Sequence, residues 1–81
     1  MKVTNNDFRP IDYGNGYIHG VYFQRADGIN VEVVRCYAND WNVFLTRNGN
    51  VVARSIDEYR RCGNGYLRYT SAMKIARLLA K

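Results

Sequence analysis

The chain has too few cysteines and histidines for a disulfide-rich scaffold or a zinc site. Its 81 residues include two cysteines, Cys36 and Cys62, and one histidine, His19. The cysteines lack the close spacing of a metal site, so reduced thiols are expected. A disulfide between them is the alternative, if the fold brings them together. We therefore expect neither a metal nor a cofactor.

Long apolar runs and catalytic motifs are also missing. No stretch is apolar enough to span a bilayer, and the amino terminus has no cleavable signal pattern. No phosphate-binding loop, zincin motif or serine-hydrolase elbow occurs, and the chain has only seven acidic residues. We expect a soluble cytoplasmic protein that is not an enzyme, with no small-molecule substrate and no membrane target.

Acidic residues are absent from the last quarter of the chain. All seven lie within residues 1–58, together with six basic residues, whereas residues 59–81 contain six basic residues and no acid. Such an asymmetry creates a positive field that attracts nucleic acid or an acidic protein surface. The six basic residues are Arg60, Arg61, Arg68, Lys74, Arg77 and Lys81.

The middle of the chain has the composition of β-strands. β-Branched and aromatic residues are dense in four segments, YIHGVYFQR, INVEVVRCY, WNVFLTR and VVARS. Asp27-Gly28 and Asn48-Gly49 favour two-residue hairpin turns, because both dipeptides tolerate positive φ. We predict an antiparallel meander of about four strands in a domain over residues 17–81. The polar segment 1–16 precedes it and has room for a short strand.

The turns also predict which residues face one another. A two-residue turn at Asn48-Gly49 places Leu45 opposite Val52, and a two-residue turn at Asp27-Gly28 places His19 opposite Cys36. A Cys–His pair is the start of a nucleophile or a metal site, but a buried cysteine is more often inert. The segment VEVVRC breaks its alternation, which predicts a bulge or burial on both faces. The expected core side carries Trp41, Val43, Leu45 and Val52.

Two helices are expected after the strands. Ser55 and Glu58 form a capping box, and Gly63 suits a helix end, which predicts a short helix over residues 56–62. A terminal helix, capped by Thr70 or Ser71, then packs its apolar face on the sheet and turns a basic stripe outward. The apolar face comprises Ala72, Ile75, Ala76 and Leu79, and the stripe Lys74, Arg77 and Lys81. The predicted fold class is α+β.

Tyrosines alternate with the basic residues near the carboxyl terminus. Tyr59, Tyr66 and Tyr69 lie among the arginines of this region. Arginine binds phosphate through its planar fork, and aromatic rings offer stacking surfaces for bases. We predict a non-catalytic nucleic-acid-binding module in which the six basic residues bind phosphates and Tyr66 or Tyr69 stacks. The simpler alternative is a solvated basic helix beside tyrosines that fill the core.

A second candidate surface lies on the Asn48-Gly49 hairpin, which Arg47 and Arg54 flank. A β-ribbon can place such arginines in the DNA major groove. An exposed hairpin with ordinary surface charges is the more frequent situation.

Protein binding is the competing functional class. Small free-standing domains of phages and mobile elements, including inhibitors of the anti-CRISPR and host-takeover type, block host proteins or nucleoprotein complexes by covering a functional surface. Arginine and tyrosine are enriched at the centres of protein interfaces, so the same residues suit an acidic protein partner. A membrane-surface helix is a weaker third alternative. Pairing of sheet edges between two copies of the chain is a further alternative, which would give a homodimer.

Overall fold

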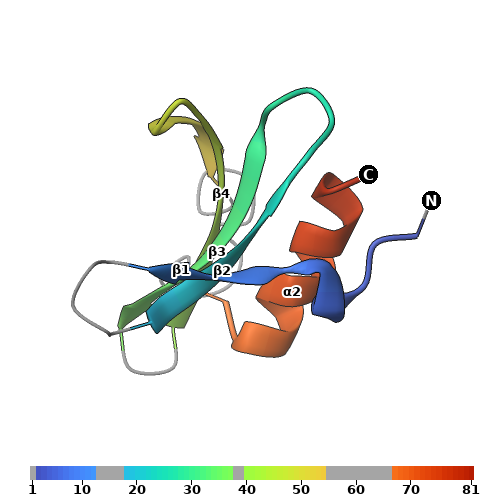
Figure 1. Cartoon of the computed structure of the whole chain (residues 1–81). Helices are drawn as coiled ribbons and strands as arrows, with labels where there is room; N and C mark the ends of the chain where they lie inside the picture. Colours follow the sequence, from blue (N-terminus) through green and yellow to red (C-terminus); the bar gives the residue numbers. More distant parts are fainter. Residues whose placement is uncertain (1, 13–17, 38–39, 55–66) are drawn as a thin grey trace.

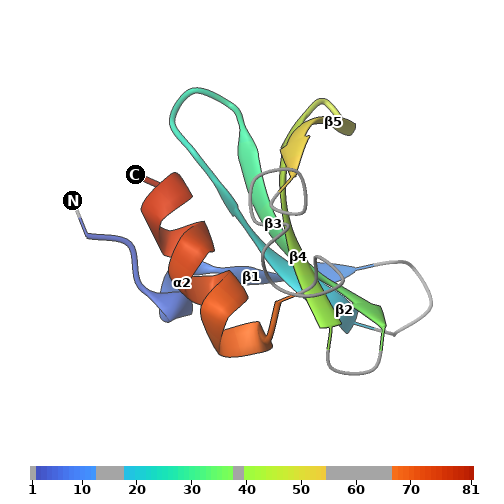
Figure 2. The same cartoon turned by 180° about the vertical axis from the view of Figure 1, so that it is seen from behind.

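The computed structural model describes residues 2–12, 18–37, 40–54 and 67–81, which form an antiparallel sheet and a helix packed against it (Figures 1 and 2). The sheet order follows the chain, β1-β2-β3-β4-β5. This confirms an α+β meander, with five strands instead of about four. The elements are η1 (Asn5–Asp7, a 3-10 turn), β1 (Arg9–Asp12), β2 (Ile18–Gln24), β3 (Asn30–Tyr37), β4 (Asp40–Arg47), β5 (Asn50–Arg54) and α2 (Tyr69–Leu79).

The additional strand is β1, which comes from the polar amino-terminal segment. Pro10 pairs with Val21 of β2, and its missing N–H is tolerated because β1 is an edge strand. Val3 and Phe8 are buried in the core, and the ring centroid of Phe8 lies 5.7 Å from that of Phe23. Residues 2–12 therefore pack with the rest of the sheet and helix.

The β2–β3 hairpin closes through three residues instead of two. The Arg25 amide donates to the Ile29 carbonyl at 2.8 Å, and the Gly28 amide donates to the Arg25 carbonyl at 3.0 Å. Gly28 has a φ of 87°, the left-handed conformation that ends a three-residue hairpin loop. The longer loop shifts the strand pairing by one residue relative to the prediction.

This shift makes the predicted pairing of His19 with Cys36 wrong. Gly20 faces Val34 in the observed ladder, a register that does not bring His19 opposite Cys36. The side chains of these two residues, and all of Cys62, lie outside the described parts. Among the described residues, no three His, Cys, Asp or Glu side chains group to hold a metal ion.

The Asn48-Gly49 turn is confirmed, but the strand after it contains a bulge. Asn48 and Gly49 both have positive φ, 52° and 82°, and Arg47 pairs with Asn50 as expected. The register then shifts between Leu45 and Thr46, so Leu45 faces Ala53. The predicted placement of Val52 on the core side is wrong: it is 57% exposed, because one extra residue moves a side chain to the opposite face.

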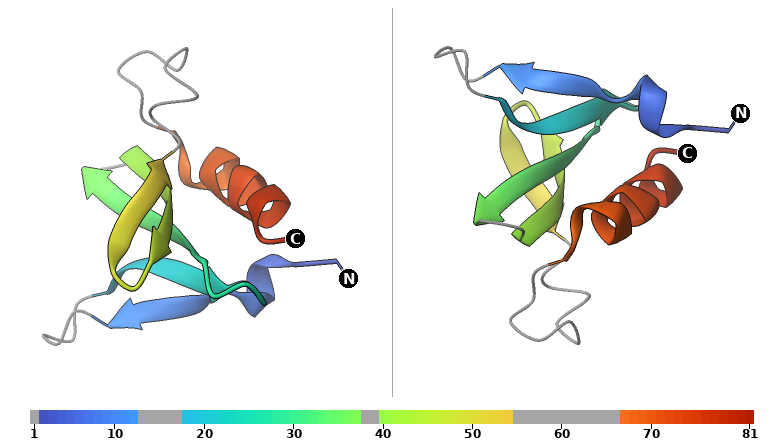
Figure 3. Two further views of the ribbon diagram at one scale, coloured as in Figure 1. Left: turned by 90° about the horizontal axis from the view of Figure 1, so that it is seen from above. Right: turned by 90° about the horizontal axis from the view of Figure 1, so that it is seen from below.

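The core lies between the sheet and α2, which contacts β3 and β4. The sheet is strongly twisted, and α2 packs along one side of it with the two termini close together (Figure 3). Val31 and Val33 are fully buried, and a register shift between Arg35 and Tyr37 confirms the predicted bulge of this strand. The core residues are Val3, Phe8, Val31, Val33, Val43, Leu67, Ala72, Met73, Ala76 and Ala80, with Trp41, Leu45, Ile75 and Leu79 packed against them.

The helix begins earlier than its predicted cap. Leu67 and Trp41 exchange backbone hydrogen bonds of 3.0 and 2.8 Å, and α2 starts directly after this bridge, with Arg68 as its N-cap. Thr70 and Ser71 are therefore inside the helix, and the predicted cap is wrong. The predicted helix over residues 56–62 lies outside the described residues. In the described parts, no helix combines the length and the apolar character needed to cross a membrane.

Candidate anion-binding site

The outer side of α2 carries a line of cations. Lys74 and Arg77 lie on α2 at helical spacing, on the side opposite Ala72 and Ala76, and Lys81 follows two residues after the helix ends at Leu79. Lys74 and Lys81 are exposed, and Arg77 is half-buried. The structure thus brings together three of the predicted phosphate-binding residues.

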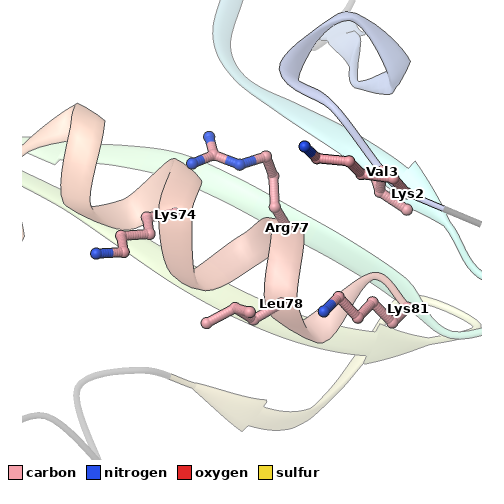
Figure 4. A pocket seen from close by; sticks show the side chains of 6 residues that line it. All are labelled: Lys2, Val3, Lys74, Arg77, Leu78 and Lys81. Carbon is pink, nitrogen blue, oxygen red and sulfur yellow. The ribbon is translucent and has the colours of Figure 1, made fainter.

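The amino-terminal segment adds a fourth cation to this line. Val3 is only 5% exposed and anchors the segment in the core beside α2, and Lys2 projects next to it. Together the two segments enclose a hollow of about 460 Å³, none of whose lining residues is acidic (Figure 4). The hollow is lined by Lys2, Val3, Lys74, Arg77, Leu78 and Lys81, which we call the cationic hollow.

The four head groups do not converge on one point. Figure 4 shows the side chain of Lys2 extending toward Arg77, while the ammonium group of Lys74 points away toward the start of α2. Lys81 lies at the opposite end of the stripe. The cations therefore form a track along the helix instead of a pocket for a single ion.

Arg77 is held in place by the amino-terminal turn. Its Nη1 donates a hydrogen bond to the side-chain oxygen of Asn5 in η1. The Asp7 carboxylate stabilises η1 by accepting the Thr4 amide at 2.8 Å and the Thr4 hydroxyl at 3.2 Å. Asn5 is a neutral partner, so this contact does not neutralise the guanidinium group of Arg77.

The carboxylates of Asp27 and Glu32 form their contacts with residues outside the cationic hollow. Asp27 forms an ion pair with Arg25, and the Glu32 carboxylate accepts a hydrogen bond from the Thr46 hydroxyl at 2.5 Å. The hydrogen bonds from Arg25 and from the Ile29 amide lower the pKa of Asp27 from 3.8 to about 2. Neither Arg25 nor Asp27 lines the cationic hollow.

The hollow also has an apolar component. Leu78 is 59% exposed and lies between the cations, and the largely buried Val3 also borders the hollow. Lysine side chains add their aliphatic stems to such a surface while the ammonium groups stay in water. The cationic hollow is therefore amphipathic, and it suits an anion that carries an apolar or planar group.

The other predicted carboxyl-terminal residues lie apart from the hollow or outside the description. Arg68 is exposed at the start of α2. Tyr69 is 41% exposed and packs on Trp41, with 4.7 Å between ring centroids, so its ring is on the sheet side of the helix. Arg60, Arg61 and Tyr66 are outside the described residues.

The second predicted surface is separate from the first. Arg47 is exposed at the β4–β5 turn, which lies far from α2 in Figure 1. The side chain of Arg54 is outside the description. Arg47 therefore lies apart from the cationic hollow.

Sequence reasoning missed the residues that complete the site. Lys2, Asn5 and Leu78 were not among the predicted site residues, and the first two lie in the polar segment 1–16, which the prediction set before the main domain. The available signal was weak: Val3 and Phe8 are isolated apolar residues in a polar stretch. They are nonetheless the residues that dock the segment beside α2.

No protein-family model matches this chain, and no curated protein and no solved structure matches it. A function must therefore be inferred from the chemistry of its own surface.

Proposed function

We propose that this chain is a non-catalytic, cytoplasmic nucleic-acid-binding module. The observation that carries the proposal is the cationic hollow, where residues from both ends of the chain place four positive charges around one depression without an acidic neighbour in its lining. Lysine and arginine side chains displace counterions from a phosphate backbone, and this release drives binding that is independent of sequence.

The length of the cationic track matches several phosphates. Lys74 lies within α2 and Lys81 lies two residues after its end, and these seven residues span about 10 Å when the helical rise is continued past Leu79. Each strand of B-form DNA carries one phosphate per about 3.4 Å of axis, so the stripe covers about three phosphates. Lys2 flanks the stripe, and the exposed Arg68 is a separate cation at the start of α2. In this proposal, Arg60 and Arg61 add further phosphate contacts, and Tyr66 or the exposed part of Tyr69 offers a stacking surface.

The salt dependence of binding tests the electrostatic part of the proposal. Fluorescence anisotropy with labelled oligonucleotides gives the dissociation constant at increasing NaCl concentration. Four neutralised phosphates predict a slope of log affinity against log salt of about −3 for a single strand and about −3.6 for a duplex. A flat response would refute the proposal.

Charge reversal tests where the nucleic acid binds. Lys74→Glu and Lys81→Glu should each weaken binding about tenfold, since each replaces an attraction with a repulsion. Arg47→Glu, which makes the same change of charge at the distant β4–β5 turn, should weaken it less than about threefold. Equal losses for all three variants would show binding through net charge alone.

Protein binding is a second candidate function, favoured by the exposure of Leu78 among the cations. An apolar side chain ringed by basic groups resembles the centre of a protein interface more than a plain phosphate contact. The partner would be an acidic surface of a host protein or nucleoprotein complex, which the module blocks in the manner of phage-encoded inhibitors. The test is to reconstitute a complex from this protein and a purified protein partner after nuclease treatment. A complex that forms without nucleic acid and is lost with Leu78→Asp would support this function over nucleic-acid binding.

A further inference from the structure

Resting on the proposed nucleic-acid function, we infer that the cationic hollow accepts an unstacked nucleotide of a single strand, with the phosphates on the cations and the base or sugar against Leu78. Single-stranded nucleic acid is then the preferred ligand class, and a duplex binds more weakly at the same site.

The size of the hollow exceeds what a phosphate requires. Its volume of about 460 Å³ leaves room for more than a phosphate group. A phosphate that touches a protein surface needs only donors and positive charge at a shallow contact. The remaining space is available to the organic part of a nucleotide.

The apolar lining has no role in a purely electrostatic contact. Leu78 is 59% exposed in the middle of the basic stripe, and Val3 borders the same space from the amino-terminal segment. A single exposed leucine is common on protein surfaces. This one lies in the wall of a hollow where cations attract an anion, so a bound nucleotide would cover it.

A duplex cannot fill this space. Its bases are stacked inside the helix, and its outer surface presents phosphates and sugars. Unstacked bases of a single strand are free to pack on protein side chains while the backbone follows a basic groove. The combination of a cationic track and an apolar wall therefore favours the single strand.

The test compares a short oligothymidine strand with a duplex of equal length, in the same buffer and at the same salt concentration. Leu78→Ser should lower affinity for the single strand by about fivefold, the loss expected when part of an apolar contact is removed, and should change duplex affinity less than twofold. Lys74→Glu should lower both affinities. Val51→Ser is the matched control, because Val51 is also exposed, at 49%, but lies on β5.

A second measurement does not depend on any substitution. On addition of the oligothymidine strand, the methyl proton resonances of Leu78 should move upfield through the ring current of a nearby base. The duplex should leave them nearly unmoved.

Each outcome separates this inference from the proposed function. Lys74→Glu tests the nucleic-acid function, which stands if this variant binds both ligands more weakly. The single-strand preference is wrong if Leu78→Ser lowers the affinity for both ligands equally or changes neither affinity. If the unmodified protein binds neither ligand, both fail. Binding of anionic phosphatidylserine vesicles that depends on Leu78, without oligothymidine binding, would also overturn both.

Discussion

Nη1 of Arg77 donates a hydrogen bond to the side-chain oxygen of Asn5, which joins the last helix to the first turn of the chain. The contact holds the amino-terminal segment at the side of α2 where Lys2 meets the basic stripe. The proposed binding surface is therefore a product of the tertiary fold, built from both ends of the chain.

Asn5→Asp should weaken nucleic-acid binding without weakening the fold. The new carboxylate would pair with Arg77 and neutralise one of the four charges of the cationic hollow. The slope of log affinity against log salt should become shallower by about 0.7–0.9, the value for one phosphate contact. Titrations at several salt concentrations measure it, with Asn50→Asp on β5 as the charge-matched control. An unchanged slope would mean that Arg77 does not contact phosphate.

Arg25→Ala should destabilise the protein by loosening the end of α2. Nη1 of Arg25 donates to the main-chain oxygen of Leu79 at 3.0 Å, so the β2–β3 loop satisfies a carbonyl at the helix end. Loss of this charged hydrogen bond should lower the free energy of unfolding by about 1–2 kcal/mol, measured by urea denaturation. Arg9→Ala, at an exposed position of β1, should change it by less than about 0.5 kcal/mol. Equal effects would show that the Leu79 contact contributes nothing.

Asp27 should make stability depend on pH under acidic conditions. Its pKa falls from 3.8 to about 2 in the folded protein, chiefly through the hydrogen bonds from Arg25. A carboxylate with a lowered pKa contributes stability above its unfolded pKa, and this contribution is lost as the pH falls from about 4 to about 2. The difference in melting temperature between the unmodified protein and Asp27→Asn should therefore shrink over that range. A difference that stays constant between these pH values would contradict this assignment.

Gly20→Ala should destabilise the sheet between β2 and β3. A Cβ atom at this position would lie 2.3 Å from the carbonyl oxygen of Val33, so the backbone would have to move. Forced shifts of this kind cost about 1–3 kcal/mol in unfolding free energy. Val52→Ala, at an exposed position of β5, serves as the control and should have a small effect. Equal midpoints in chemical denaturation for Gly20→Ala and the unmodified protein would show that β2 has room to relax.

Local patterns predicted the parts of the fold that depend on local chemistry. Asn48-Gly49 adopts the expected turn because few other dipeptides tolerate two positive φ angles. Ala72 and Ala76 face the core because helical spacing places them on one side. Both features follow from neighbours within a few residues of each other.

Register and the complete site depend on contacts between distant segments. The same Asp27-Gly28 dipeptide fits a two-residue loop or a three-residue loop. The three-residue loop shifts the register by one residue, so Cys36 is not the residue opposite His19. Lys2 joins the cationic hollow only because Val3 and Phe8 dock on the core. A polar segment with two isolated apolar residues carries little sign of such docking.

The most direct test of the proposed surface is an amide chemical-shift map of the labelled protein during titration with an oligothymidine strand. Binding at the cationic hollow predicts the largest shifts at residues 2–5 and 74–81, with little change at the β4–β5 turn. Largest shifts at residues 47–51, or no saturable shifts at low salt, would contradict the proposed surface.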